Sequence, residues 1–127
     1  MNVDAPSTWR AVCRDEGLPT ERGVAALLAE GQVAIVRMSD GTLYCVGHRD
    51  PFGGANVIAR GLVGSTTIDG VRVPTVASPM YKQVFDLRDG SCLSEPGVTL
   101  GSWEVRSRDG NIEVGRCVAE PTGCRDE

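Results

Sequence analysis

Short apolar runs, which alternate in part with polar residues, recur along most of the chain. Six of them are rich in the β-branched and aromatic residues that strands favour. They span residues 32–38, 42–48, 70–76, 83–87, 102–107 and 111–117. Outside one ambiguous segment, no apolar stripe with the period of a helix accompanies them. The pattern therefore predicts an all-β fold.

Asp-Gly pairs punctuate this pattern and indicate where the strands turn. Aspartate and glycine tolerate the positive φ angles that tight hairpin turns require. The pairs are Asp40-Gly41, Asp69-Gly70, Asp89-Gly90 and Asp109-Gly110. Short strands separated by turns at such intervals are typical of an antiparallel β-sandwich or small barrel, here with about eight to ten strands.

The segment TERGVAALLAEG, residues 20–31, is the ambiguous one. Its composition favours a helix, whereas the rhythm of the neighbouring runs favours a strand over 24–28 that turns at Glu30-Gly31. We adopt the strand. Residues 1–7 and the polar stretch 117–127 are expected to be flexible, which leaves one domain over 8–116.

Charge and hydropathy limit which partners the protein is expected to bind and where in the cell it is expected to be. The 127 residues carry a net charge of -4 without a Lys/Arg run, so neither nucleic acid nor an anionic membrane is an expected partner. The N-terminus shows no basic region followed by an apolar stretch, and no run approaches the roughly 20 apolar residues of a membrane span. We expect a cytoplasmic protein.

The usual catalytic and metal-binding patterns are missing. The five cysteines form no C-x-x-C, so reduced thiols are expected, with a redox pair of Cys117 and Cys124 as the alternative. His48 is the only histidine and cannot supply a two-histidine metal site. The glycines of 53–61 lack the patterns of dinucleotide and phosphate loops. An unrecognised active site around His48, Asp50 and Tyr81 stays open as an alternative.

Two loops that begin with X-Pro resemble the two cluster-binding loops of Rieske-type iron–sulfur domains. That family has Cys-Pro-His-x-Gly-Ala in the first loop, and Cys-Pro-x-His followed by Phe-Asp-Leu and a glycine turn in the second. Here the first loop is DPFGGA (50–55), where Pro51, Gly54 and Ala55 match, and the second is SPMYKQVFDLRDG (78–90), where Pro79 and FDLRDG match. The resemblance covers residues 8 to 115 and implies a Rieske-like fold.

The ligand positions that this resemblance assigns are all changed. A Rieske cluster is held by two cysteines on one iron and two histidines on the other. The cysteine positions fall on Asp50 and Ser78, and the histidine positions on Phe52 and Tyr81. The resemblance therefore implies a Rieske-like scaffold with no metal ligands and no [2Fe–2S] cluster, which also argues against an electron-transfer ferredoxin. We expect the two aromatic rings to fill the vacated space.

A narrower resemblance rests on these replacements occurring together. With WRAVC near the start and GVTLGSWEVRSRDGNIEV near the end, they resemble the small subunits of bacterial assimilatory NAD(P)H-dependent nitrite reductases. The resemblance implies a non-catalytic, cofactor-free chain that supports a large subunit carrying FAD, sirohaem and a [4Fe–4S] cluster, which reduces nitrite to ammonium. Phe52, Met80, Tyr81 and Lys82 are the candidate docking residues. The alternative is a free-standing, cluster-less Rieske-like binding or regulatory module.

Overall fold

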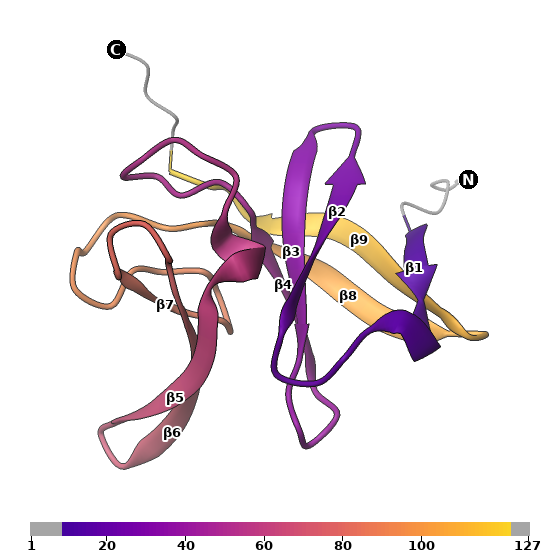
Figure 1. The fold of residues 1–127 in the computed structure, drawn as a ribbon, viewed down its shortest axis with the longest axis horizontal. Helices are drawn as coiled ribbons and strands as arrows, with labels where there is room; N and C mark the ends of the chain where they lie inside the picture. Colours follow the sequence, from indigo (N-terminus) through magenta and orange to yellow (C-terminus); the bar gives the residue numbers. More distant parts are fainter. Residues whose placement is uncertain (1–8, 123–127) are drawn as a thin grey trace, which may run out of the picture.

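The computed structural model describes residues 9–122, which form strands joined by turns and loops (Figure 1). The strands are β1 (Arg10–Arg14), β2 (Gly23–Leu28), β3 (Gly31–Arg37), β4 (Leu43–Gly47), β5 (Leu62–Ile68), β6 (Val71–Ala77), β7 (Val84–Asp86), β8 (Ser102–Arg108) and β9 (Asn111–Ala119). Two single-turn 3-10 helices, η1 (Asp15–Gly17) and η2 (Ile58–Arg60), interrupt them. The all-β prediction is confirmed.

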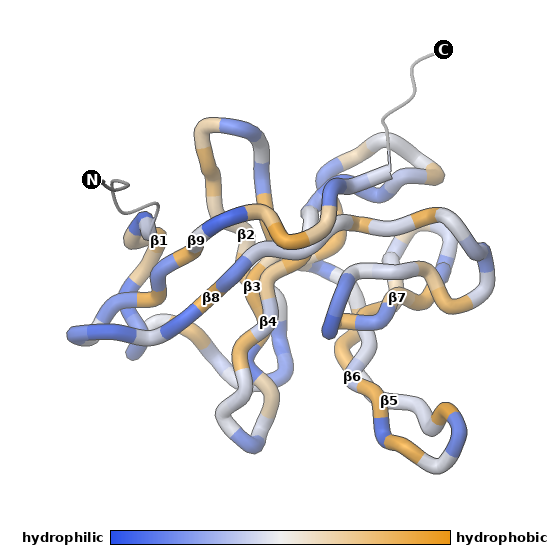
Figure 2. Tube along the Cα trace, turned by 180° about the vertical axis from the view of Figure 1, so that it is seen from behind, coloured by the Kyte–Doolittle hydropathy of each residue, from blue (hydrophilic) through white to orange (hydrophobic). Residues whose placement is uncertain are grey.

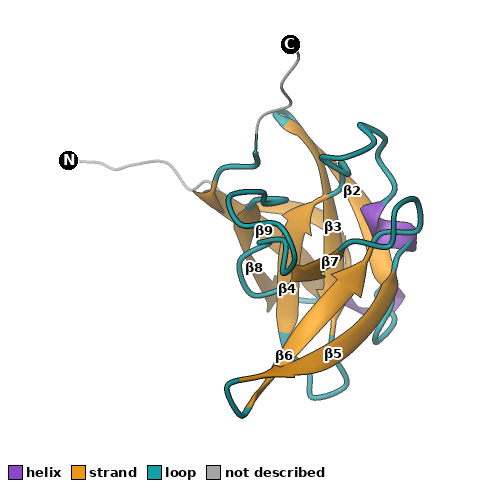
Figure 3. Ribbon diagram, turned by 90° about the vertical axis from the view of Figure 1, so that its left-hand side faces the viewer, coloured by secondary structure: helices purple, strands orange, loops and turns teal. Residues whose placement is uncertain are grey.

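The strands form two antiparallel sheets. The larger has six strands in the order β1-β9-β8-β4-β3-β2 and curls into a partly closed barrel. The smaller has three strands in the order β5-β6-β7, and its β5–β6 hairpin projects from the body of the molecule (Figure 3). Of the two loops that resemble cluster loops, 50–55 follows β4 on the way from the larger sheet to the smaller one, and 78–83 joins β6 to β7 within the smaller sheet.

The Asp-Gly pairs form turns of two kinds. Asp69-Gly70 and Asp109-Gly110 have positive φ at both residues, and they close tight hairpins between the paired residues Ile68 and Val71 and between Arg108 and Asn111. In the other two pairs the aspartate carboxylate accepts a backbone N–H two residues on, from Thr42 and Ser91, both at 2.9 Å. These are Asx turns, a second use of the same dipeptide.

β3 holds the two halves of the core together because both of its faces are buried. Ala34 and Val36 belong to a first core between the sheets, whereas Val33 and Ile35 belong to a second core inside the barrel. The first core comprises Ala34, Val36, Val46, Ile58, Val76, Phe85, Leu87, Cys92 and Leu100. The second comprises Leu18, Leu28, Val33, Ile35, Cys45, Trp103, Ile112 and Val114. Figure 2 shows the apolar stretches of β3 and β4 in the middle of the molecule.

The structure settles the ambiguous segment and moves one boundary. Residues 20–31 contain the strand β2, which pairs with β3 along its whole length, so the strand interpretation is confirmed. The flexible tail expected from residue 117 is wrong for its first part. β9 continues to Ala119, which pairs with Ser102, and the Thr122 N–H then bonds the Thr99 carbonyl at 2.9 Å. Residues 1–8 and 123–127 lie outside the described residues.

Two strands, β1 and β5, were not among the predicted runs. The segment WRAVC supplies β1, which pairs with β9 across a bulge between Ala11 and Cys13. The bulge disturbs the alternation of apolar and polar positions that would have revealed the strand. Within 9–122, no helix is long and apolar enough to cross a membrane.

Candidate functional site

The two loops that resemble cluster loops lie side by side and are joined by their first residues. The Ser78 hydroxyl donates a hydrogen bond to the Asp50 carboxylate. Both side chains are buried, and Asp50 is 0% exposed. A buried carboxylate is stable only if hydrogen-bond donors surround it. The contact therefore links the loops at the positions that the resemblance assigns to the two cysteines.

Each of these two side chains also shapes its own loop. Asp50 Oδ1 accepts the N–H groups of Phe52 at 2.8 Å and Gly53 at 3.3 Å. Ser78 Oγ accepts the N–H of Met80 at 3.2 Å. Each loop is then closed by a backbone bond spanning four residues, from Gly54 N–H to the Asp50 carbonyl at 2.7 Å and from Lys82 N–H to the Ser78 carbonyl at 3.0 Å. The two loops thus share one design.

The donor set at this place does not fit a [2Fe–2S] cluster. The Asp50 carboxylate and the Ser78 hydroxyl already satisfy each other and the loop backbones, and neither is a thiolate. Phe52 has no donor atom, and Tyr81 offers only a phenol. Among residues 9–122, no group of three or more His, Cys, Asp or Glu side chains could hold a metal ion. We therefore derive no chemistry from a cluster here.

The two aromatic residues behave differently from each other. The Phe52 ring packs on the fully buried Phe85, with ring centroids 6.4 Å apart, and is 38% exposed. Tyr81 is 55% exposed and Met80 is 44% exposed. Both lie against Gly53, where an added Cβ would approach Tyr81 Cε2 to 2.8 Å and Met80 Sδ to 3.1 Å. The expected filling of space holds for Phe52 in part, whereas Tyr81 stays at the surface.

Phe52, Met80, Tyr81 and the exposed Lys82 thus form one surface patch, which we call the tip. Two loops far apart in the sequence contribute to it, and the small Gly53 lets their side chains meet. An apolar and aromatic patch with a lysine at its margin has the composition of a protein–protein contact surface. Arg49, which the sequence suggested as a further orienting charge, lies beside Gly54 and is exposed.

His48 ties the end of β4 to the backbone of residues 57–59. Its ring is buried, and Nδ1 accepts the Ala59 N–H at 3.0 Å. Its carbonyl accepts the N–H groups of Val57 and Ile58, both at 3.0 Å. Burial, assisted by the charge of Arg60, lowers the pKa of His48. His48 makes no hydrogen bond to Asp50 or Tyr81, so the structure does not assemble the alternative active site.

Burial lowers the reactivity of Cys45 and Cys117. Cys13, Cys45, Cys92 and Cys117 are free thiols. Burial raises the pKa of Cys45 to about 12, and the pKa of Cys117 is also raised, chiefly by burial. The thiolate is the reactive form of cysteine, so a raised pKa lowers reactivity. Cys124 lies outside the described residues, and the suggested pair with Cys117 stays an expectation.

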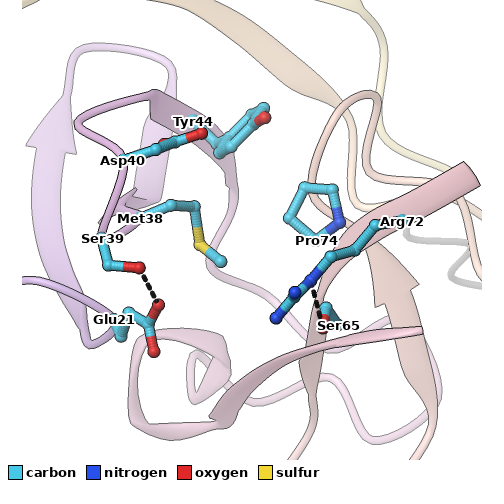
Figure 4. Close-up of a pocket in the computed structure, with 8 residues that line it drawn as sticks. All are labelled: Glu21, Met38, Ser39, Asp40, Tyr44, Ser65, Arg72 and Pro74. Atoms are coloured by element: carbon cyan, nitrogen blue, oxygen red, sulfur yellow. Dashed lines mark hydrogen bonds between the residues drawn. The ribbon is translucent and has the colours of Figure 1, made fainter. Parts of the chain in front are cut away.

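Two open hollows were not foreseen, since segments distant in sequence form them. The first, of about 380 Å³, lies between the β3–β4 turn and the β5–β6 hairpin (Figure 4). Its polar groups pair locally: Ser39 Oγ donates to Glu21 at 2.8 Å, and Arg72 Nε donates to Ser65 Oγ at 3.1 Å. The second, of about 670 Å³, lies beside His48 and Trp103.

Comparisons with known proteins agree with this geometry. The Rieske-like [2Fe-2S] domain family matches residues 8–115. The nitrite reductase (NADH) small subunit of Escherichia coli K12 is 33% identical over 109 residues, 85% of this chain and 97% of that protein. A crystal structure from Mycobacterium tuberculosis, assigned as an NADH-dependent nitrite reductase small subunit, has a TM-score of 0.77 and 41% identity, covering 88% of this chain and 97% of that one.

One further relative is much longer than this chain. The nitrite reductase [NAD(P)H] large subunit of Klebsiella oxytoca is 36% identical over 107 residues. These residues make up 84% of this chain but only 11% of that protein. A domain of this kind therefore occurs both as a separate small chain and as a part of a large subunit.

Proposed function

Because the chain belongs to the Rieske-like [2Fe-2S] domain family and, within it, to the nitrite reductase small subunits, we propose that it is the non-catalytic small subunit of an NAD(P)H-dependent nitrite reductase. Its task is to dock on the large subunit and support it. The enzyme is an oxidoreductase that converts nitrite to ammonium. The large subunit would carry the FAD, the sirohaem and the [4Fe–4S] cluster, and the complex would work in the cytoplasm.

The observation that carries this proposal is the domain shared with the Klebsiella oxytoca large subunit. The same domain is a separate protein in Escherichia coli and a part of the large-subunit chain in Klebsiella. A domain that occurs both as a separate chain and as part of the large-subunit chain is expected to work together with the large subunit in both cases. When the domain is part of the large-subunit chain, its docking is intramolecular and its effective concentration at the docking site is high. A separate small subunit lacks this advantage and must bind the large subunit with sufficient affinity instead.

Within this proposal the tip is the docking surface. Tyrosine and methionine are enriched in protein interfaces, and exposed aromatic side chains often dominate the binding energy. The loops that carry the tip are held rigidly, because Asp50 and Ser78 fix both of them from inside. A preformed surface loses little conformational entropy when it binds. Lys82 adds a positive charge that can orient the approach to an acidic partner surface.

The experiment is to purify the tagged chain from its own cells grown on nitrite and to record the absorbance of the eluate. The proposal predicts that a large, coloured partner with flavin and sirohaem bands is recovered. It also predicts that the small chain, separated from this partner, is colourless and contains no iron. A solitary, colourless chain that never retains a partner would contradict the subunit proposal and favour a free-standing module. Iron bound to the separated chain would contradict the cluster-free reading.

A further inference from the structure

The outer edge of β5 has none of the features that keep sheet edges apart. β5 is the first strand of the sheet β5-β6-β7, so one of its edges is unpaired among the described residues. Residues 61–68, GLVGSTTI, contain no charge and no proline. The strand pairs with β6 over seven residues without a bulge. Long, flat, uncharged edge strands readily pair with another strand.

The other sheet edges are shorter than β5, and each is bulged or partly covered. β1 carries Arg10 and Arg14 and has a bulge, and the Ala59 backbone lies against Gly23 of β2, where an added Cβ would come within 2.6 Å of the Ala59 carbonyl. β7 is only three residues long, and the Leu93 N–H bonds the Val84 carbonyl on its outer side. The β5–β6 hairpin, in contrast, projects away from the body (Figures 1 and 3).

The two-residue turn of the β5–β6 hairpin fixes which backbone groups of β5 face outward. A two-residue turn makes Ile68 and Val71 a hydrogen-bonded pair, and bonding then alternates along the strand. Pro74, which has no N–H, falls opposite Ser65 at a position not bonded to β5, as this alternation requires. The outward N–H and C=O groups are therefore those of Val63, Ser65 and Thr67.

These outward groups are placed symmetrically about Ser65, and so are the exposed apolar side chains of β5. In an antiparallel pair of two β5 strands with Ser65 on the two-fold axis, Val63 of one copy lies opposite Thr67 of the other. Leu62, which is 79% exposed, then lies opposite Ile68, which is 37% exposed. The pair falls at a position without backbone bonds, where side chains approach most closely. Neither β5 strand carries a charge, and Arg72 of β6, which donates to Ser65 Oγ, lies on the opposite face of the sheet from this contact.

We propose that the outer edge of β5 is a self-association surface, on which a second copy of this chain pairs antiparallel through β5, centred on Ser65. The two smaller sheets then form one six-stranded sheet across the two-fold axis. Each Leu62 covers the Ile68 of the other copy, so the contact occurs twice. The tip is formed by other residues and is not part of this surface. The proposal does not rest on the proposed subunit function, because self-association is a property of the isolated chain.

The first test is sedimentation equilibrium of the full chain over a concentration series, with a matched pair of variants. Leu62→Lys places a charge on the edge, and Leu27→Lys places the same charge at a residue of similar exposure, 77%, on β2. We expect the wild-type chain and L27K to dimerise alike and L62K to dimerise about tenfold more weakly, because the lost pair occurs twice. A wild-type chain that stays monomeric throughout, or equal effects of the two variants, overturns the proposal.

A second test reads the register itself. The double variant Leu62→Cys/Ile68→Cys is expected to form disulfide-linked dimers on oxidation, because the two positions face each other across the axis at about 4.5 Å between Cα atoms. In each single variant the introduced cysteine lies far from the same cysteine of the other copy, so the single variants serve as controls. They also reveal any disulfide that forms with a native cysteine. Equal cross-linking of single and double variants overturns the register. If L62K impairs only binding to a large subunit while the wild-type chain is monomeric, the edge belongs to that partner and the proposal is wrong.

Discussion

At the scale of single residues, Asp50 and Ser78 decide how the two loops are held. A fully buried carboxylate here accepts two backbone N–H groups and one hydroxyl. The hydroxyl in turn accepts a backbone N–H of its own loop. The positions where the resemblance places metal-binding cysteines thus carry a hydrogen-bonded pair. Sequence reasoning identified both positions, but the contact between them became visible only with the backbones in place.

We predict that Asp50 and Ser78 are energetically coupled. Asp50→Ala should lower the free energy of unfolding by about 3 kcal/mol, because it leaves buried donors without an acceptor. Ser78→Ala should lower it by about 1.5 kcal/mol. The double variant should cost about 1 kcal/mol less than the sum, since both changes remove the same bond. Urea unfolding of the four proteins measures this, and strict additivity would show that the bond does not link the loops.

His48 gives a prediction about pH. The pKa of His48 is lowered in the folded state, so the unfolded chain binds a proton at this ring more readily than the folded chain does. Stability is therefore complete above the unfolded pKa, near 6.5, and declines as the pH falls below it, with a slope no steeper than about 1.4 kcal/mol per pH unit.

The control for this pH effect is His48→Asn, whose Oδ1 can still accept the Ala59 N–H but does not titrate. Because His48 is the only histidine, the difference in pH dependence between the two proteins isolates this ring. The measurement is urea unfolding of both proteins between pH 7.5 and 5. If the stability of the two proteins depended on pH in the same way, His48 would be protonated as readily in the folded state as in the unfolded state, which would contradict the prediction.

At the scale of elements, β3 is the strand on which both sheets depend. Its run Val33-Ala34-Ile35-Val36 does not alternate in polarity, because neighbouring side chains enter different cores. The sequence showed that this run is a strand but not that it is buried on both sides. That follows from the smaller sheet, which covers the face of the barrel that would otherwise be exposed. Strand chemistry is local, whereas layer packing is not.

This arrangement predicts that both faces of β3 are sensitive to substitution. Ile35→Ala should cost about 3 kcal/mol and Val36→Ala about 2 kcal/mol, because each leaves a cavity in a different core. Thr66→Ala on the exposed strand β5 is the control and should change stability by less than about 0.5 kcal/mol. Denaturant unfolding measures all three. If Val36→Ala were as harmless as Thr66→Ala, the packing of the two sheets on each other would be in doubt.

At the scale of the whole molecule, the strand pattern predicted an antiparallel β-sandwich or small barrel, whereas the resemblance predicted the Rieske-like fold itself. Two of the four Asp-Gly pairs, Asp69-Gly70 and Asp109-Gly110, close two-residue hairpins as predicted, because such hairpins depend on local φ angles. The other two form Asx turns. The tip was partly foreseen, since all four of its residues were named as candidates. What could not be predicted was that Tyr81 and Met80 rest on Gly53 while Phe52 packs on Phe85. These contacts depend on how the fold brings the loop after β4 beside the loop after β6.

The central claim is that the former cluster loops have become a docking surface. The most direct measurement is the affinity of the purified large subunit for the wild-type chain, for Tyr81→Ala and for Leu27→Ala. Tyr81 and Leu27 are both exposed, so neither change should affect folding. We predict that Y81A weakens binding about thirtyfold, as expected for an interface tyrosine worth about 2 kcal/mol, while L27A binds like the wild type. Unchanged binding by Y81A, or equal weakening by L27A, would contradict docking through the tip.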